Sequence, residues 1–489
     1  MRNKYLGLIL LFVLCLWGDY SMAQKGTQSP YSSYGIGELN RRSYASISGM
    51  GGVSVASTDS TVVNSNNPAS YAFFSRNKPI FQVGLSGKTS DFSNATSTST
   101  QRHFGLNQFQ LGLPIKKNWG IGVGIKPYSF TGYTITNFDV VDQDTLGQAV
   151  SEGSGGIRIA NLGLGYKPLN AYKKAYKPRV LLDSLGNVIS RDSVGYWKTR
   201  TLSFGFNANY LFGTSLNTRS NEFLPSYGSN FNARVQNGIR MSGYTFEFGA
   251  SYQIGRITAT KNTSLSIAGS YTPAMAVRAF EDILTYSYVG SYYKGETTGI
   301  VDTIEFADNV EGKLYMPDVY KIGVEYRIGS VRGNRSMLRL AAEVNYETWS
   351  NFKSEFGTVT SDVNSMKDRL FVAAGIEWNP STISGMRNNT TSFLSRLKYR
   401  VGVNYTDTEL KINNNLGEIS TVQDYGMSFG IGIPVSISNA STNINIGANF
   451  GALGSTENGL IKENYIGFQV GISITPGNGD YWFVKRKYD

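Results

Sequence analysis

The chain is poor in the residues that most enzyme and metal sites require. Its 489 residues include one cysteine, Cys15, and one histidine, His103. A hydrolase of the Ser-His-Asp type needs an imidazole to move the proton, and zinc sites are built mainly from Cys and His. His103 stands at the start of an expected strand, where a lone histidine is usually polar surface. We therefore expect no catalytic residue, no metal site and no cofactor, and we do not expect an enzyme.

Charge and long apolar runs are also scarce. Charged residues make up 17% of the chain, against about a quarter in a typical soluble domain. Beyond the N-terminus, no apolar run approaches the roughly 18 residues that a membrane-spanning helix needs. Low charge without apolar helices is typical of an outer-membrane β-barrel, whose strands alternate apolar and polar positions.

The first 23 residues have the pattern of a signal peptide. Arg2 and Lys4 precede an apolar stretch from Leu6 to Trp17, and Ser21-Met22-Ala23 resembles a cleavage site. We predict that residues 1–23 are removed on export. Cys15 would be removed with them, which leaves a mature chain without a thiol.

The formal net charge of the whole chain is +11. Its basic residues are scattered and form no stripe beside stacking aromatics, so a nucleic-acid partner is not expected. An exported barrel that faces phosphate-rich lipid headgroups explains the excess better.

From residue 79 onward the sequence alternates with period two, as expected for strands with one apolar and one polar face. The clearest stretch is 202–212, LSFGFNANYLF. A soluble β-sandwich would show the same alternation, but these strands reach about ten residues or more, as tilted membrane strands do. Aromatic residues at strand ends are typical of an interfacial girdle. They are Trp119, Tyr346, Trp349 and Phe483.

The segmentation predicts about fourteen strands between residues 80 and 475, an even number as in bacterial barrels. The seventh, 263–290, is one strand bent at Thr272-Pro273. Short connections then fall on the periplasmic side. Longer loops are expected outside, near residues 131–155, 214–239, 291–312, 350–368 and 408–424. Two connections, 169–198 and 380–395, are long on the periplasmic side, and the first contains a candidate hairpin of its own.

A small, polar segment lies between the leader and the first strand. Gly49, Gly51 and Gly52 allow tight or left-handed backbone geometry, Asp59 favours a turn and Pro68 fixes φ. By composition alone, both an ordinary surface loop and a compact plug fit this segment.

Residues 49–70, GMGGVSVASTDSTVVNSNNPAS, resemble the N-terminal hatch of the FadL-type long-chain fatty-acid transporters, with Asn67-Pro68-Ala69 matching an Asn-Pro-Ala motif. Three further similar pieces follow in the family's order. They are MPDVYKIGVEYR (316–327), LRLAAEVNYETWSNF (338–352) and RLKYRVGVNYTDT (396–408). The resemblance implies an all-β, transmembrane antiparallel β-barrel of about fourteen strands, with the hatch inside the lumen and a lateral opening in the wall.

This resemblance divides the chain into a signal peptide (1–23), an N-terminal hatch (24–78) and a transmembrane barrel (79–489) that ends in a basic tail. It implies a bacterial outer-membrane location, with the lipid bilayer and lipopolysaccharide as surroundings. The candidate hatch residues are Gly49, Gly51, Gly52, Asp59, Asn67, Pro68 and Ala69.

Two functions fit these features. The first is passive uptake of hydrophobic compounds such as long-chain fatty acids, with Met50, Phe73 and Phe74 as candidate ligand contacts, although packing of the plug against the wall explains the same residues. The alternative is a non-transporting FadL-like barrel that acts as a scaffold or shuttle subunit of a secretion or assembly complex and binds periplasmic or outer-membrane proteins. The long connections and the basic tail suit the alternative. A continuous apolar tunnel would favour transport, and a lumen filled by charged pairs would favour the scaffold.

Overall fold

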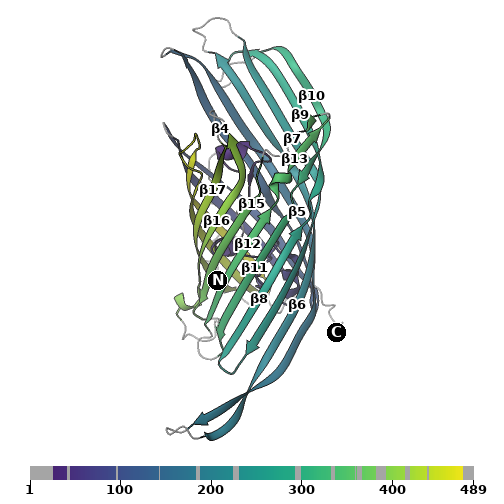
Figure 1. Cartoon of the computed structure of the whole chain (residues 1–489), viewed down its shortest axis with the longest axis vertical. Helices are drawn as coiled ribbons and strands as arrows, with labels where there is room; N and C mark the ends of the chain where they lie inside the picture. The colour runs from purple at the N-terminus through teal and green to yellow at the C-terminus, as the bar shows by residue number, and fades with distance from the viewer. Residues whose placement is uncertain are drawn as a thin grey trace, which may run out of the picture.

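In the computed structural model the chain forms a closed antiparallel β-barrel with an N-terminal segment inside it (Figure 1). The structure describes residues 26–40, 44–76, 78–94, 97–141, 144–182, 188–223, 231–291, 299–331, 336–357, 359–360, 366–381, 392–413, 419–437 and 440–476. The predicted signal peptide, the basic tail and most of the 380–395 connection lie outside these residues. Among them, no helix has the length and apolar character that crossing a membrane requires.

In the described part of the chain the helical elements are short. They are η1 (Pro30–Ser33), α2 (Ala45–Ser48), η2 (Pro68–Phe73), η4 (Trp349–Asn351) and η5 (Leu394–Arg396). The strands are β1 (Glu38–Leu39), β2 (Ile80–Ser93), β3 (Thr98–Lys116), β4 (Trp119–Val141), β5 (Asp144–Leu182), β6 (Val188–Phe223), β7 (Asn232–Ile257), β8 (Lys261–Thr272), β9 (Met275–Val289), β10 (Gly299–Met316), β11 (Val319–Ser330), β12 (Met337–Glu347), β13 (Lys353–Phe356), β14 (Val359–Thr360), β15 (Arg369–Asn379), β16 (Lys398–Asn413), β17 (Ile419–Ile437), β18 (Ala440–Leu453) and β19 (Lys462–Thr475).

The wall has 14 strands, which confirms the predicted barrel. In order around the wall they are β2, β3, β4, β5, β6, β7, β8, β11, β12, β15, β16, β17, β18 and β19. The barrel closes where β19 pairs antiparallel with β2. We call the end at which β3 meets β4 and β7 meets β8 the turn end, and the opposite end the loop end.

Two neighbouring wall strands are long and interrupted at the same level. β8 continues into β9 past Pro273, as predicted, and β10 continues into β11 past Pro317. β8 pairs with β11 from Thr272 opposite Val319, and β9 pairs with β10 up to Met275 opposite Met316. Proline cannot donate to the ladder, so both strands lose a hydrogen bond at this level and the wall bends there.

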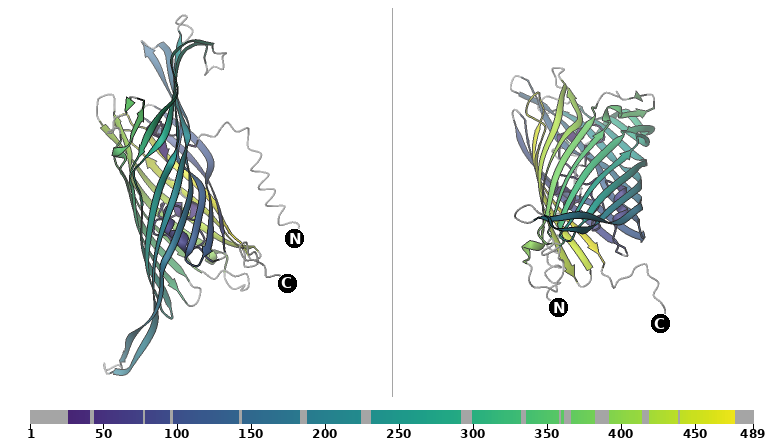
Figure 2. Two further views of the ribbon diagram at one scale, coloured as in Figure 1. Left: turned by 90° about the vertical axis from the view of Figure 1, so that its right-hand side faces the viewer. Right: turned by 60° about the horizontal axis from the view of Figure 1, so that its bottom comes forward.

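Several strands extend well beyond the barrel at both ends (Figures 1 and 2). At the loop end, residues 131–155, 214–239 and 291–312 had been predicted as loops, but β4 to β7, β9 and β10 continue through much of them. Strands with water on both faces need no alternation, so the sequence pattern does not reveal them. At the turn end β5 and β6 stay paired to Leu182 opposite Val188, which matches the hairpin expected within 169–198.

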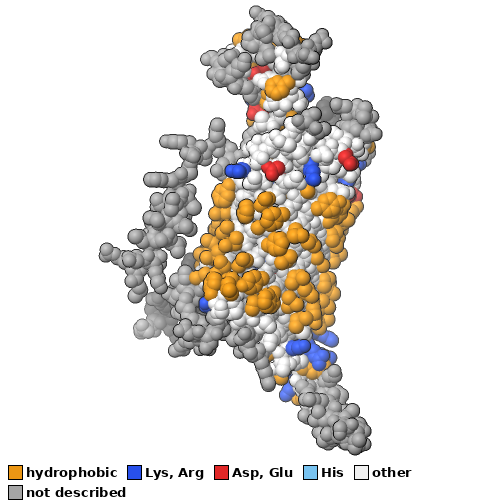
Figure 3. Space-filling view, turned by 90° about the vertical axis from the view of Figure 1, so that its left-hand side faces the viewer, with side chains coloured by type: hydrophobic (Ala, Val, Ile, Leu, Met, Phe, Trp, Pro, Cys, Tyr) orange, Lys and Arg blue, Asp and Glu red, His pale blue; other side chains and the backbone are white. Residues whose placement is uncertain are grey.

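The outer surface carries a continuous apolar band (Figure 3). Each wall strand contributes at least one large exposed apolar side chain. One from each strand, in wall order, gives Val83, Leu106, Val123, Leu162, Phe204, Phe248, Ile267, Ile322, Val344, Ile376, Val403, Phe429, Ile446 and Phe468. Charged side chains are found above and below this band, so it is the surface that a membrane barrel presents to lipid.

One predicted girdle residue lies elsewhere. Trp119 and Tyr346 are exposed at strand ends, but Trp349 is 1% exposed and packs with Phe352 in the core. β12 ends at Glu347 and η4 turns the chain inward, where the Trp349 indole donates to the Glu347 carboxylate at 2.7 Å. The prediction for Trp349 was therefore wrong, and Phe483 lies outside the described residues.

Candidate functional site in the barrel lumen

The described residues of the N-terminal segment, 26–40, 44–76 and 78–79, are enclosed by the wall and contact most of its strands. α2 contacts β17, β18 and β19 on one side, and η2 contacts β3 to β7 on the other. Figures 1 and 2 show both helices, in purple, within the barrel. The segment therefore occupies the lumen from wall to wall.

Glycines on the inner face of the wall make room for the backbone of this segment. A Cβ atom at Gly205 would lie 2.2 Å from the Ala69 amide nitrogen, and one at Gly402 would lie 2.1 Å from that of Gly51. Real Cβ atoms essentially never come within 3.0 Å of such an atom. The same close approach to the segment occurs at Gly120, Gly165, Gly249 and Gly375. Glycine inside a strand often marks the close approach of another backbone. The glycines within the predicted strands are therefore the sequence signal that could have identified these positions.

The glycines of the segment itself have different roles. Gly51 and Gly52 have φ of 76° and 95°, a left-handed conformation that favours glycine. Gly49 has an ordinary helical φ of -61°, but a Cβ there would lie 2.9 Å from the Gly430 Cα. Two of these glycines thus serve a turn, and the third serves a close contact with β17.

The Asn67-Pro68-Ala69 motif begins η2. The Asn67 side chain accepts a hydrogen bond from the Ala69 amide at 3.0 Å and donates one to the Val55 carbonyl at 2.8 Å. Pro68 stands at the first helical position, where its missing N–H costs nothing. Asn67 is 1% exposed, so this buried amide joins two parts of the segment.

Polar side chains of the wall hold the segment's backbone. The Glu343 carboxylate on β12 accepts from the Ser54 and Val55 amides at 2.6 and 2.7 Å. The Gln82 side chain on β2 bonds to both the N–H and the C=O of Val63, at 2.9 and 3.3 Å. Opposite sides of the barrel thus hold the backbone of the same short segment.

Asp59 adds a charged contact to β16. Its carboxylate accepts from the Thr61 amide at 2.9 Å and lies 3.9 Å from the Lys398 ammonium. Burial opposes ionisation of Asp59, but the charges of Lys398 and Arg339 outweigh it and lower the pKa of the carboxyl. Asp59 is therefore ionised whenever the segment is in place near neutral pH.

The wall below the segment carries a cluster of buried ion pairs across four neighbouring strands. The Arg400 Nε lies 2.6 Å from the Glu377 carboxylate, with both side chains at most 2% exposed. The Arg339 guanidinium lies 3.0 Å from Glu325 and 3.5 Å from Glu377. This part of the lumen is filled by charged pairs.

Residues 26–40 close the loop end of the lumen. β1 pairs with β4 through Glu38 opposite Phe130, and the Ser29 hydroxyl donates to Glu463 on β19 at 2.9 Å. Lys88 on β2 lies 2.5 Å from Glu463 and 3.4 Å from Glu38. The strap formed by residues 26–40 is therefore fastened to three strands.

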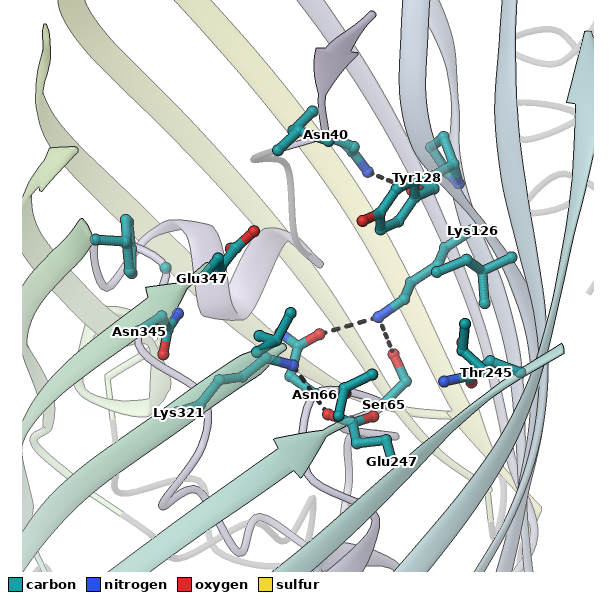
Figure 4. Close-up of a pocket in the computed structure, with 18 of the residues that line it drawn as sticks. Asn40, Ser65, Asn66, Lys126, Tyr128, Thr245, Glu247, Lys321, Asn345 and Glu347 are labelled. Carbon is teal, nitrogen blue, oxygen red and sulfur yellow. Dashed lines mark hydrogen bonds and ion pairs between the residues drawn. The ribbon is translucent and has the colours of Figure 1, made fainter. Parts of the chain in front are cut away.

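A cavity of about 240 Å³ lies between this strap and the rest of the segment (Figure 4). Pockets for drug-sized ligands have volumes of about 300–1,000 Å³, so this one is small. Its lining is mixed, with Tyr128, Leu211 and Phe371 beside charged groups. Within it the Lys126 ammonium donates to Ser65 and Asn66.

The cavity reaches the wall where the two long strands break, because Pro273 and Pro317 both line it. Asp318 joins the two breaks, since its carboxylate accepts from the Ala274 amide at 3.0 Å and from the Tyr271 hydroxyl at 2.8 Å. The wall is thus bent but connected beside the cavity.

The candidate ligand residues do not gather at this cavity. Met50 is fully buried and packs with Val53 and two alanines of the wall. Phe74 stacks on Tyr71 at 5.7 Å, and Phe73 lies under the Lys167 ammonium at 4.7 Å. None of the three lines the cavity. Their surroundings fit the packing alternative.

Sequence reasoning did not identify the charged lining of the cavity. The Lys321 ammonium on β11 lies 2.9 Å from the Glu247 carboxylate on β7, and Lys126 lies on β4. Glu247 occupies a polar position of an alternating strand, which predicts that it faces the lumen. No signal in the sequence shows that residues from three distant strands meet.

The fold and this lumen define a FadL-like barrel. The crystal structure of a Pseudomonas aeruginosa FadL homologue is similar over 90% of this chain and 99% of that chain, with 12% sequence identity and a TM-score of 0.50. The Ralstonia pickettii toluene transporter TbuX is similar over 88% of this chain and 97% of its own, with 11% identity and a TM-score of 0.49. A likeness at such identities shows the fold alone. No curated protein matches the chain significantly.

The chain belongs to the BamG family, whose model matches residues 4–174 and 190–489. The resemblance to FadL-type transporters is therefore correct for the fold, but the family is BamG and not the FadL family itself.

Proposed function

We propose that the protein is a non-transporting FadL-like barrel that acts as a scaffold or shuttle subunit of an outer-membrane secretion or assembly complex. The observation that carries this proposal is the attachment of the N-terminal segment, which is seated on wall glycines and bonded to β2, β12 and β16. A segment held in this way is a fixed plug rather than a moving hatch. The charged pairs that fill the lumen below the segment support the same reading, and membership of the BamG family is in keeping with partners in an outer-membrane complex.

The proposed location is the bacterial outer membrane, with the apolar band in the bilayer, the loop end outside beside lipopolysaccharide, and the turn end in the periplasm. The β5–β6 ribbon, residues 167–182 and 188–196, then reaches into the periplasm. Past the end of β4 and β7 its two strands pair only with each other in the described part of the chain. An isolated two-stranded ribbon is marginally stable in water, so this element suits contact with a periplasmic partner.

A shortened ribbon tests the scaffold role. Residues 176–195 are replaced by Asn-Gly between Ala175 and Tyr196, which face each other in the register. The tagged protein is then extracted from the outer membrane in mild detergent and separated by native electrophoresis. We expect the wild type in a larger complex with defined partner proteins and the shortened variant as a free barrel.

A matched control shortens a hairpin at the other end. Residues 284–306 are replaced by Asn-Gly between Ile283 and Ala307, which are also register partners. This variant should keep the complex. A shortened β5–β6 ribbon that keeps the whole complex, in cells that still take up apolar compounds, would end the scaffold proposal.

A second candidate function is passive uptake of hydrophobic compounds, and one arrangement favours it. An apolar pocket of about 190 Å³ at the loop end is lined by Ile36, Leu314 and Phe352. The central cavity begins three residues further along the strap, at Leu39, and ends at the two strand breaks. Movement of β1 would join the pockets into a path to the wall. Faster uptake of a labelled fatty acid by cells that contain the protein than by cells that lack it would support this function.

A further inference from the structure

Three cationic side chains form a row across three neighbouring strands of the wall at the turn end, where the β5–β6 ribbon leaves the barrel. Lys173 on β5 is the register partner of Lys198 on β6, which is the partner of Arg256 on β7. Register partners present their side chains on one face, with Cβ atoms about 4.5–5.5 Å apart. All three side chains are exposed. Three positive charges are thus held side by side on neighbouring strands of one sheet.

The row lies on the outward face of the wall. Side chains two residues apart share a face of a strand. Ile254, two residues before Arg256, is 46% exposed in the apolar band, and Phe204 on β6 is 50% exposed at the same parity as Lys198. The row therefore continues the lipid-facing surface toward the turn end. Figure 3 shows Lys and Arg side chains gathered directly below the apolar band at this end.

No carboxylate neutralises the row within the described part of the chain, where none of the ion pairs includes Lys173, Lys198 or Arg256. Two of the cations lie near the Tyr196 ring, with the Lys198 ammonium 5.9 Å and the Arg256 guanidinium 4.2 Å from its centre. Like charges directly opposite each other destabilise a sheet. The ribbon region 167–200 contains eight Lys and Arg and two Asp, a net charge of +6. An external anion would remove this repulsion.

We propose that Lys173, Lys198 and Arg256 form a binding site for the phosphate of an anionic phospholipid headgroup, in the leaflet next to the turn end. The position of the row favours a lipid over an acidic protein as the ligand, because the row adjoins the apolar band on the same outward face. Tyr196 lies beside the row on this face, and Trp and Tyr are enriched at the headgroup level of membranes. Basic residues there gain affinity from anionic lipids. The site does not depend on whether the barrel transports or acts as a scaffold.

Native mass spectrometry of the purified full-length protein tests the site. The protein is titrated in detergent with phosphatidylglycerol, and the wild type is compared with the triple variant Lys173→Gln, Lys198→Gln, Arg256→Gln. We expect the triple variant to lose affinity by roughly tenfold or more, since each cation near a membrane surface contributes separately. Migration of the unheated protein on an SDS gel confirms that each variant is a folded barrel.

Two matched variants separate this site from general charge. Lys173→Arg with Lys198→Arg keeps the charge and should bind like the wild type. Lys174→Gln removes a cation from the opposite face, where Lys174 lies over the Tyr176 ring at 5.3 Å, and should also bind normally. Equal phosphatidylglycerol binding by the triple variant and the wild type would overturn the proposal.

Competition experiments distinguish other anions. Inorganic phosphate at the same concentration should not displace the lipid, and displacement would mean that free phosphate is the ligand. Poly-L-glutamate stands for an acidic protein. If the triple variant lost poly-L-glutamate binding but kept phosphatidylglycerol, the row would be a protein-docking surface and the lipid site would be wrong.

Discussion

Single glycines decide how closely the N-terminal segment approaches the wall. The inner face of β6 has no side chain at Gly205, and the Ala69 amide occupies the space where a Cβ would stand. Gly205 belongs to the backbone of the closed wall, and the Ala69 amide belongs to the backbone of the segment packed inside it. Neither backbone can therefore move aside at low cost in free energy. Substitution of a single wall glycine therefore tests whether the segment is seated in the barrel.

We predict that Gly205→Ala destabilises the folded barrel and Gly105→Ala does not. Overpacking of a well-packed site costs about 1–3 kcal/mol, whereas a Cβ at Gly105 on β3 has no atom within 4 Å. The measurement is the temperature at which the folded band on an SDS gel disappears, together with protease cleavage within residues 44–76. Equal midpoints and equal cleavage in the two variants would contradict the seated arrangement.

A charged contact between the N-terminal segment and β16 predicts how the attachment of the segment responds to pH. Asp59, in the N-terminal segment, faces Lys398 at the start of β16. The folded-state pKa of Asp59 is lowered, so the contact contributes stability above the ordinary pKa of 3.8 and is lost only as the pH falls through the lower, folded value. The contact between Asp59 and Lys398 should thus be unchanged between pH 7 and pH 5.

Hydrogen exchange at the Thr61 amide, which donates to Asp59, is the measurement. After correction for intrinsic exchange, its protection should be equal at pH 7 and pH 5 in the wild type. Asp59→Asn should lower the protection at both values. Protection that falls between pH 7 and pH 5 in the wild type would show that another group controls the attachment.

The sequence predicts elements well where one face must meet lipid. Alternation over 202–212 and the bend at Pro273 both follow from the local sequence, because lipid and proline constrain the strand directly. The extensions of β9 and β10 were not predicted, because a strand with water on both faces needs no alternation of apolar and polar residues. Trp349 was misplaced because a single turn after β12 decides whether its ring faces lipid or the core.

The lumen could be predicted only in part. Gly51 and Gly52 were selected from local turn chemistry and Asn67 from the resemblance to a hatch motif. In the structure the two glycines have left-handed φ angles and Asn67 caps η2. The cavity lining was not predictable, because Lys126 and Glu247 meet only through the closure of the barrel. Such contacts depend on register around the wall, which no local pattern specifies.

At the scale of the whole molecule, the central claim is that the N-terminal segment is a fixed plug. A disulfide between the segment and the wall would leave the function of such a plug unchanged, but it would arrest a moving hatch. Val55 and Gly323 suit this design, since a Cβ at Gly323 would lie 3.3 Å from the Val55 Cβ. Disulfides join Cβ atoms about 3.5–4.5 Å apart, so a small adjustment is enough. Cys15, the one native cysteine, lies in the predicted leader.

The most direct test is to compare the Val55→Cys, Gly323→Cys variant in its oxidised and reduced forms. In each form the complex is examined by native electrophoresis and the uptake of a labelled fatty acid is measured. Our account predicts the same complex and the same uptake whether the disulfide is closed or open. Uptake that is present in the reduced form and abolished by the disulfide would contradict it and would show that the segment is a moving hatch.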